Sequence, residues 1–233
     1  MSKKLYACSD LHGEYKLWEK IRDFCDNDDQ IFFLGDAADR GPNGIKIMQE
    51  LLDDPRVTYL MGNHEDIFTG YALQWIRDKK LNDFSYWKSQ GGYPTMNGFF
   101  NLRRNEQIEL YNSIIELPHF IILPNHNGDI INLSHAGFTP GQEPNFKNEF
   151  DEQYFFIWNR SHFDQKWTGK DNEYVVHGHT PNRGFMEKYC NGHKFNIDTG
   201  AFATGVTCLL DLDTFTPTYF TYDGEEKKDA TDS

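Results

Sequence analysis

Residues 5–41 read LYACSDLHGEYKLWEKIRDFCDNDDQIFFLGDAADRG. Two short apolar runs, at residues 4–8 and 30–34, predict buried strands. The segment between them carries its apolar residues on one helical face, at Leu17, Trp18, Ile21, Phe24 and Cys25. The stretch therefore predicts a strand, an amphipathic helix and a second strand, which is the opening of a β-α-β unit.

The same alternation continues along the chain. Residues 43–52 repeat the helical pattern, and further strands are predicted at residues 57–61, 129–133 and 173–176. Metal-type ligands follow these apolar runs, at Asp10, Asp36, Asn63, His135 and His179. In an open α/β sheet the ligand site lies beyond the carboxyl ends of the strands, so we expect these side chains to converge.

The length of 233 residues fits one large α/β domain, which we place at residues 1–222. The wide gap between Asn63 and His135 predicts a mostly helical insertion after the third strand, a cap at about residues 66–125. Residues 223–233 are polar and are expected to fray.

The final third of the chain has a different pattern. KFNIDTGAF and TCLLDLDTFTPTYFTYD alternate β-branched and aromatic residues between turn signals, which predicts a β-meander that completes a second sheet. The predicted fold class is therefore α/β, with two sheets stacked as a sandwich.

Composition excludes several classes of partner. The net charge of −13 disfavours nucleic acid and anionic membranes, because both are bound through summed contacts with Lys and Arg. No apolar run is long enough to cross a bilayer and no signal-peptide pattern is present, so we expect a cytoplasmic protein. The four cysteines show no C-x-x-C spacing, which favours reduced thiols. No feature indicates an obligate partner.

The ligand types indicate a binuclear metal site. Asp10 and His12 lie two residues apart after the first strand, so a carboxylate oxygen and an imidazole nitrogen can face one ion. Asp36 could bridge to a second ion, because a shared carboxylate holds two metals about 3.5–4 Å apart. The second ion's remaining ligands are predicted to be Asn63, His135 and His179. This set favours Mn²⁺, our first expectation, or Fe, Zn²⁺ or Mg²⁺, and ligand softness alone does not choose among them.

Charge indicates the substrate class. Two divalent ions bring four positive charges and the carboxylates of Asp10 and Asp36 bring two negative ones, so the site would attract an anion. If Arg40 and Arg160 face it, their guanidinium groups can bind phosphate oxygens bidentately. We therefore predict phosphoester hydrolysis by direct attack of a water or hydroxide bound to the two metals.

His64 directly follows Asn63 and is predicted to be the general acid that protonates the leaving oxygen. Asp39, three residues after Asp36, could hold the imidazole of His64 and favour its protonated form. The alternative for Asp39 is a solvated loop residue or a helix cap.

The motifs SDLHG, GDAADRG, GNHE, SHAG and HGHT resemble those of the metallophosphoesterase superfamily. Within it they resemble the phosphoprotein phosphatase branch, which contains the metal-dependent serine/threonine phosphatases. The length of the chain and its motifs are similar to those of the small lambda-type enzymes of bacteria and bacteriophages. The resemblance covers Asp10 to about Gly200. It implies a calcineurin-like α/β/β/α sandwich of two mixed sheets and a site with two metal ions.

The resemblance also implies residue roles. The first metal would be held by Asp10, His12 and Asp36, and the second by Asp36, Asn63, His135 and His179. The catalytic residues would be His64 as acid, Asp39 as its partner and Arg40 as a phosphate clamp. A second clamp, Arg160, matches a W-x-R element of the family, and Arg183 is its competitor.

Other stretches receive a supporting role. WKSQGGYPTM, residues 87–96, and NIDTGAF, residues 196–202, resemble elements of the bacterial branch and are expected to shape the pocket. Asp198 is expected to be a hydrogen-bond hub and His177 a buried residue. The remaining histidines are expected at the surface, at His119, His126, His162 and His193.

Three functions stay open. The first expectation is a serine/threonine protein phosphatase that could also accept phosphotyrosine, since a histidine acid suits poor alkoxide leaving groups. The alternative is a hydrolase of diadenosine tetraphosphate or another nucleotide, whose adenine could stack on aromatic residues of the cap, Trp75, Tyr86, Trp87 or Tyr93. A non-catalytic phosphate-binding module is the least favoured, because each expected catalytic position is filled.

Overall fold

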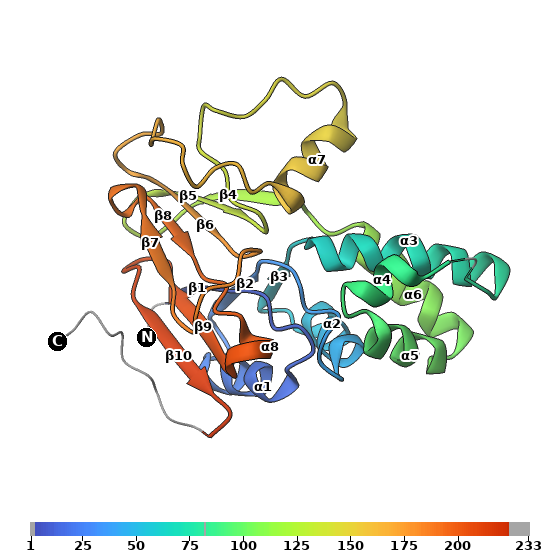
Figure 1. Cartoon of the computed structure of the whole chain (residues 1–233). Helices are drawn as coiled ribbons and strands as arrows, with labels where there is room; N and C mark the ends of the chain where they lie inside the picture. Colours follow the sequence, from blue (N-terminus) through green and yellow to red (C-terminus); the bar gives the residue numbers. More distant parts are fainter. Residues whose placement is uncertain (1–2, 82, 224–233) are drawn as a thin grey trace.

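Two five-stranded sheets lie face to face in the computed structural model, which describes residues 3–81 and 83–223 (Figure 1). The first has the order β10-β9-β1-β2-β3, from β1 (Leu5–Cys8), β2 (Gln30–Phe33), β3 (Val57–Tyr59), β9 (Val206–Asp211) and β10 (Pro217–Thr221). The second has the order β4-β5-β6-β8-β7, from β4 (Phe120–Pro124), β5 (Ile130–Ser134), β6 (Glu173–His177), β7 (Glu187–Tyr189) and β8 (Lys194–Asn196). Both sheets mix parallel and antiparallel pairs, so the predicted sandwich of two mixed sheets is confirmed.

Helices flank the sandwich. Two of them, α1 (Tyr15–Phe24) and α2 (Gly44–Asp53), pack on the outer face of the first sheet. On the other side of the molecule α7 (Glu149–Trp158) packs against the second sheet. A group of four lies between β3 and β4: α3 (Asn63–Asp78), α4 (Ser85–Ser89), α5 (Tyr93–Asn101) and α6 (Arg104–Ile115). Short elements complete the chain, a 3-10 turn at Cys190–Gly192 and α8 (Ala201–Thr204).

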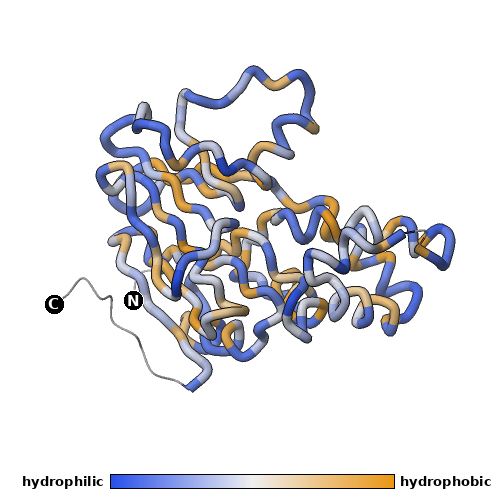
Figure 2. The backbone as a smooth tube through the Cα atoms, viewed as in Figure 1, coloured by the Kyte–Doolittle hydropathy of each residue, from blue (hydrophilic) through white to orange (hydrophobic). Residues whose placement is uncertain are grey.

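The core between the sheets comes from alternating strand residues. Leu5 and Ala7 of β1 point into it, and Leu133 of β5 and Val176 of β6 meet them from the other sheet. The intervening residues of the first sheet, such as Tyr6, pack instead against the helices. Apolar positions accordingly run along the strands of both sheets in Figure 2. Because side chains alternate across a strand, one apolar run serves two layers of core.

One prediction about the sheets is wrong. The final third was expected to complete the second sheet, but only β8 joins it, together with β7, whereas β9 and β10 extend the first sheet. Strand β9 pairs antiparallel with β1, and Leu210 lies opposite Ala7. The parallel order β1-β2-β3 leaves one edge of β1 open, and buried backbone groups on an open edge need partners. Strand β9 supplies those partners.

The helical group α3–α6 occupies most of the segment that was expected to form a cap. The expected bounds, 66–125, begin inside α3 and include β4, so the strand lies within them. A single domain through residue 222 remains a proposal. The expected frayed tail, residues 223–233, lies outside the described residues except for Asp223. Within the described part of the chain, no helix is both long and apolar enough to cross a membrane.

Leu210→Ala should lower the free energy of unfolding by about 2–5 kcal/mol, because Leu210 is fully buried between the sheets and its truncation leaves a cavity. Urea denaturation at fixed pH measures this. The control is Ile122→Ala on β4, whose side chain is 58% exposed and whose loss should matter by less than about 0.5 kcal/mol. An equal loss of unfolding free energy in the two variants would contradict the conclusion that the inter-sheet core stabilises the fold.

Candidate metal centre

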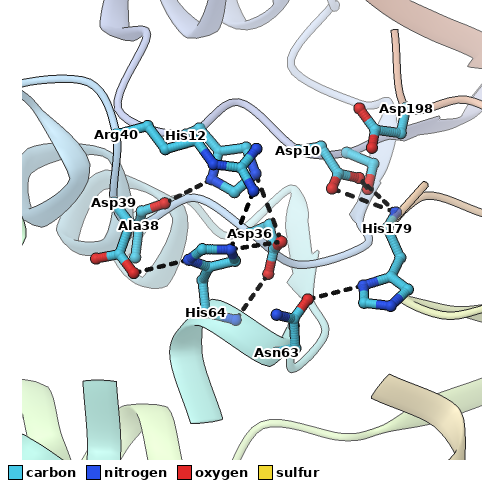
Figure 3. Close-up of polar contacts among 12 residues, drawn as sticks. Asp10, His12, Asp36, Ala38, Asp39, Arg40, Asn63, His64, His179 and Asp198 are labelled. Carbon is cyan, nitrogen blue, oxygen red and sulfur yellow. Dashed lines mark hydrogen bonds and ion pairs between the residues drawn. The ribbon is translucent and has the colours of Figure 1, made fainter. Parts of the chain in front are cut away.

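The carboxyl ends of the parallel strands bring distant residues together. Asp10 follows β1, Asp36 follows β2, and Asn63 opens α3 shortly after β3. His135 directly follows β5 of the other sheet, and His179 lies two residues after β6. The structure thus gathers the residues predicted as ligands at one edge of the sandwich, as Figure 3 shows for most of them.

Asp36 lies at the centre of this cluster. Its Oδ2 is 3.5 Å from Nε2 of His12, and its Oδ1 is 3.4 Å from Nε2 of His135. Two groups of side chains could therefore each hold an ion and share this carboxylate: His12, Asp36 and His64 in one, and Asp36, His135 and His179 in the other. The shared carboxylate is the arrangement expected for a pair of metals.

The tautomers of two histidines favour a cation. Nδ1 of His12 lies 2.8 Å from the carbonyl oxygen of Ala38, and Nδ1 of His135 lies 2.8 Å from that of Leu34. Because a carbonyl only accepts, each Nδ1 carries a proton. Burial lowers the pKa of both rings, to about 3 for His12, so both are neutral at pH 7. Each Nε2 lone pair then faces the Asp36 carboxylate, and the repulsion is relieved when a cation binds between them.

The second group is tightly packed. Oδ1 of Asn63 lies 2.9 Å from Nε2 of His135 and 2.8 Å from Nδ1 of His179, and the two imidazole nitrogens are 3.0 Å apart. Nε2 of His179 is buried with no hydrogen-bond partner among the described residues. Burial, with His135 nearby, lowers the pKa of His179 to about 2, which leaves the ring neutral. An amide oxygen and two neutral imidazoles fit a divalent ion of intermediate softness.

Asp10 is arranged differently from the other predicted ligands. Its carboxylate accepts the backbone N–H of His179, at 3.1 and 3.2 Å, and the hydroxyl of Ser9. Burial and the nearby carboxylates of Asp198 and Asp36 raise the pKa of Asp10 well above its usual value. Three buried carboxylates so close together carry more negative charge than the site can solvate, and bound cations would compensate that charge.

The backbone at the site is strained. Six residues there have φ between +46° and +70°, the left-handed region that is costly for residues with a Cβ: Asp10, His12, Asp36, Asp39, Arg40 and His179. Such conformations cluster where function requires them. They allow the loops to reverse sharply, so that the side chains turn back over the strand ends.

Glu65 organises the loop after β2, and the sequence interpretation missed it. Its buried carboxylate accepts four backbone N–H groups, from Asp36 at 2.6 Å, Ala37 at 2.9 Å, and Ala38 and Gly62 at 3.1 Å. The Asp36 loop is thereby fixed to the start of α3. Glu65 is the third residue of α3, a position where a glutamate typically caps the N-terminus, and the available signal was its place in the GNHE motif.

His64 and Asp39 are paired as predicted. Nδ1 of His64 lies 2.7 Å from Oδ2 of Asp39. Burial disfavours a charged His64, but the carboxylates of Asp36 and Asp39 outweigh burial and raise its pKa. Asp39 is itself held by the WKSQGGYPTM stretch, since Trp87 Nε1 donates to both carboxylate oxygens, at 3.0 and 3.1 Å, and Thr95 Oγ1 accepts the Asp39 N–H at 2.7 Å.

The predicted arginines lie at different depths. Nη2 of the half-buried Arg40 is 3.3 Å from Nε2 of His64, and its backbone N–H donates to the Gly91 carbonyl at 2.9 Å. Arg160 is exposed, and its Nη1 donates to Thr180 Oγ1 at 2.8 Å, one residue beyond His179. Arg183, the competitor, is also exposed. Arg40 and Arg160 thus approach the cluster from two sides.

His162 corrects another prediction. It was expected at the surface but is only 1% exposed, and its Nδ1 lies 3.1 Å from the Tyr189 hydroxyl. The same hydroxyl contacts Nε2 of His177, whose predicted burial is confirmed. Buried Lys194 donates to the His162 carbonyl at 3.1 Å. A lone histidine in a polar stretch gave no sign of this network, because its partners come from β6, β7 and β8.

Known proteins share this architecture. A family model described as calcineurin-like phosphoesterase matches residues 3–183. The chain is similar to the asymmetrical bis(5′-nucleosyl)-tetraphosphatase PrpE of Oceanobacillus iheyensis, with 26% identity over 192 residues that cover 75% of this chain and 70% of that protein.

Solved structures support the fold. A crystal structure of a proposed diadenosine tetraphosphatase has a TM-score of 0.65 at 18% identity, over 95% of this chain and 94% of that one. The cold-active protein-tyrosine phosphatase of a psychrophilic Shewanella has a TM-score of 0.57 at 17% identity, over 97% of this chain and 80% of that one.

Glu65→Gln should weaken Mn²⁺ binding by about 10–100-fold, because an amide group presents N–H donors to backbone N–H groups and releases the Asp36 loop. Calorimetric titration of metal-stripped protein measures the affinity. The matched control is Glu106→Gln, which alters the equivalent cap of α6, where Glu106 accepts the Arg103 N–H at 2.7 Å. Unchanged affinity in both variants would argue against a role of Glu65 in positioning Asp36.

Proposed function

We propose that this chain, which belongs to the calcineurin-like phosphoesterase family, hydrolyses phosphoanhydride bonds of dinucleoside polyphosphates such as diadenosine tetraphosphate. Membership makes it a metal-dependent phosphoesterase. The observation that carries the substrate class is the similarity to a bis(5′-nucleosyl)-tetraphosphatase over 75% of this chain. That similarity favours the predicted alternative, a nucleotide hydrolase, over the first expectation of a serine/threonine phosphatase.

We assign the metal ligands as the sequence suggested. Asp10, His12 and Asp36 would hold one divalent ion, and the other would be held by Asp36, Asn63, His135 and His179. The fit rests on neutral imidazoles that face a carboxylate and on the convergence of Asn63 Oδ1, His135 Nε2 and His179 Nδ1, which lie 2.8–3.0 Å from one another. When bound, the two ions would polarise a phosphoryl oxygen and lower the pKa of a water towards about 7. The metal could be Mn²⁺, as first expected, or Fe, Zn²⁺ or Mg²⁺.

His64 would donate a proton to the leaving oxygen. Its Nδ1 faces Asp39, so Nε2, which lies beside the Arg40 guanidinium, is the atom that would act on the substrate. Nε2 could also be read as a ligand, because it belongs to a cluster with His12 and Asp36. We prefer the acid role, since Nε2 is 3.9 Å from Asp36, farther than the nitrogens of His12 and His135, and the Arg40 guanidinium lies 3.3 Å from it.

Arg40 and Arg160 would bind the phosphate chain. Both cations flank the cluster, one beside His64 and one beside Thr180. A planar guanidinium matches two phosphate oxygens and stabilises the charge that develops on them during transfer. A polyphosphate offers several such oxygens, so two separated arginines suit it well.

A protein phosphatase remains the second candidate. The observation that favours it is the buried His64–Asp39 pair, because a strong proton donor matters most for a serine or threonine alkoxide and less for a nucleotide, which leaves readily. The same metal cluster would serve both reactions. The surface around it would decide which substrate binds.

Metal-stripped protein should be inactive and should regain activity with Mn²⁺. Its kcat/KM should then be about 100-fold higher for diadenosine tetraphosphate than for phosphoserine, phosphothreonine or phosphotyrosine peptides, which corresponds to about 2.7 kcal/mol of transition-state discrimination. Steady-state kinetics with each substrate tests this. A preference for any of the peptides would move the assignment to the protein phosphatases.

His64→Asn should separate the acid role from metal binding. We expect a loss of about 10²–10⁴-fold in kcat on an alkyl phosphoester and a much smaller loss on p-nitrophenyl phosphate, whose leaving group needs no proton. The control is His126→Asn, which removes an exposed imidazole paired with Asp213. Equal losses on both esters would point instead to a ligand role for His64.

A further inference from the structure

We propose that a pocket beside α7 binds a purine nucleoside of the substrate, an inference that rests on the function proposed above. The pocket lies between the loop at residues 144–147 and the exposed face of α7, and its volume is about 440 Å³. That volume falls within the range of roughly 300–1,000 Å³ that is usual for small-molecule sites.

The wall of the pocket offers aromatic ring faces. Tyr154 and Trp158 lie one turn apart on α7, with rings that are 5.7 Å apart between centroids and inclined by only 18°. Tyr154 also lies 6.2 Å from Phe150 between centroids, inclined by 26°, but it remains 49% exposed and lines the pocket, so part of its ring is accessible to a ligand. Phe146 also lines the pocket and is held against Phe155. Nucleobases stack on such rings with little regard to sequence, because every base has a π face.

One wall residue of the pocket, Trp158, lies beside the metal cluster. The Trp158 ring is 6.4 Å from the His179 ring, between centroids. Its Nε1 donates to Oδ2 of Asp66 on α3 at 3.2 Å, which fixes the plane of the indole. Arg160 follows two residues later and contacts Thr180, next to His179. A base on Tyr154 would therefore direct its phosphates past Arg160 towards the metals.

The pocket offers charged groups of both signs, because Lys147 and Asp151 both line it, and a nucleoside phosphate could use each of them. The carboxylate of Asp151 lies in the wall, where it would repel phosphate but can accept a hydrogen bond from an exocyclic amino group. Asn159 is occupied structurally, since its Nδ2 donates to the Gly137 carbonyl at 2.8 Å. Adenine and guanine both carry an amino group, so the chemistry fits a purine without choosing between them.

The aromatic residues of the helical group α3–α6, the expected source of a stacking ring, are less suitable. Trp87 is fully buried and bound to Asp39, and Trp75 is stacked on Phe100 at 3.9 Å between centroids. Tyr86 and Tyr93 remain exposed on α4 and α5. Among the described residues, neither ring packs against a histidine of the metal cluster as Trp158 packs against His179.

The test compares binding of AMP and ribose 5-phosphate to the full Mn²⁺-loaded chain, because the two probes share a phosphate and differ in the base. Calorimetry or tryptophan fluorescence should show a preference for AMP. Tyr154→Ala should reduce that preference about tenfold, whereas Tyr154→Phe, which keeps the ring and removes only the hydroxyl, should retain it. Because Tyr154 is half exposed, we expect both variants to fold, and circular dichroism checks this.

The outcomes separate this inference from the proposed function. If the preference for AMP depends on Tyr154 but diadenosine tetraphosphate is not hydrolysed, the nucleoside pocket stands and the proposed reaction falls. If the dinucleotide is hydrolysed but Tyr154→Ala leaves the preference intact, or no preference exists, the pocket assignment is overturned. If only Tyr93→Ala abolishes the preference for AMP, the base binds at α5 instead, and the assignment to the pocket beside α7 is wrong.

Discussion

The buried carboxylate of Asp36 lies between the two sheets and contacts residues that follow strands of both. It accepts the His64 N–H at the start of α3 at 2.9 Å and faces His12 of the first sheet and His135 of the second. The His64 N–H offsets part of the cost of this buried charge, whereas the neutral imidazoles of His12 and His135 turn lone pairs towards it, so a bound cation would complete the pairing. Gly62 shows how closely these groups fit, because a Cβ there would collide with Asp36 and with Glu65. Residues from both sheets and from α3 thus surround this one carboxylate.

Local patterns explain why much of the fold and the site could be predicted. A strand and an amphipathic helix are each encoded within about ten residues, so the predicted strand at residues 4–8 differs from β1 by a single residue. The convergence of the proposed ligands was predictable for a related reason. In a parallel sheet the residue after each strand lies at the same edge, which accounts for the convergence of Asp10 and Asp36 after the neighbouring strands β1 and β2. Asp10 and His179 follow strands of different sheets, so their contact also depends on how the two sheets stack.

The features that escaped prediction are set by distant partners. The antiparallel pairing of β9 with β1 fills an edge that is visible only once the order of the other strands is known. His162 is buried because Tyr189 and Lys194 surround it, and neither is near it in sequence. Glu65 was identifiable as a helix cap, yet its contacts with the Asp36 loop cross 27 residues or more. Such interactions depend on packing, which short patterns do not encode.

The aromatic residues on the two sides of the cluster have different roles: those of α3–α6 support His64, and those of α7 are proposed to bind the substrate. On the side of α3–α6, Trp87 and Thr95 are hydrogen-bonded to Asp39, which in turn holds His64. Substitutions of these residues would therefore disturb the proposed proton donor. On the side of α7, Tyr154 is 49% exposed and stacks on its helix neighbours Phe150 and Trp158, away from the His64–Asp39 pair. Changes on α7 can therefore alter which molecule binds while the chemical groups stay fixed. One fold can carry different activities when the residues that select the substrate lie apart from those that perform the chemistry.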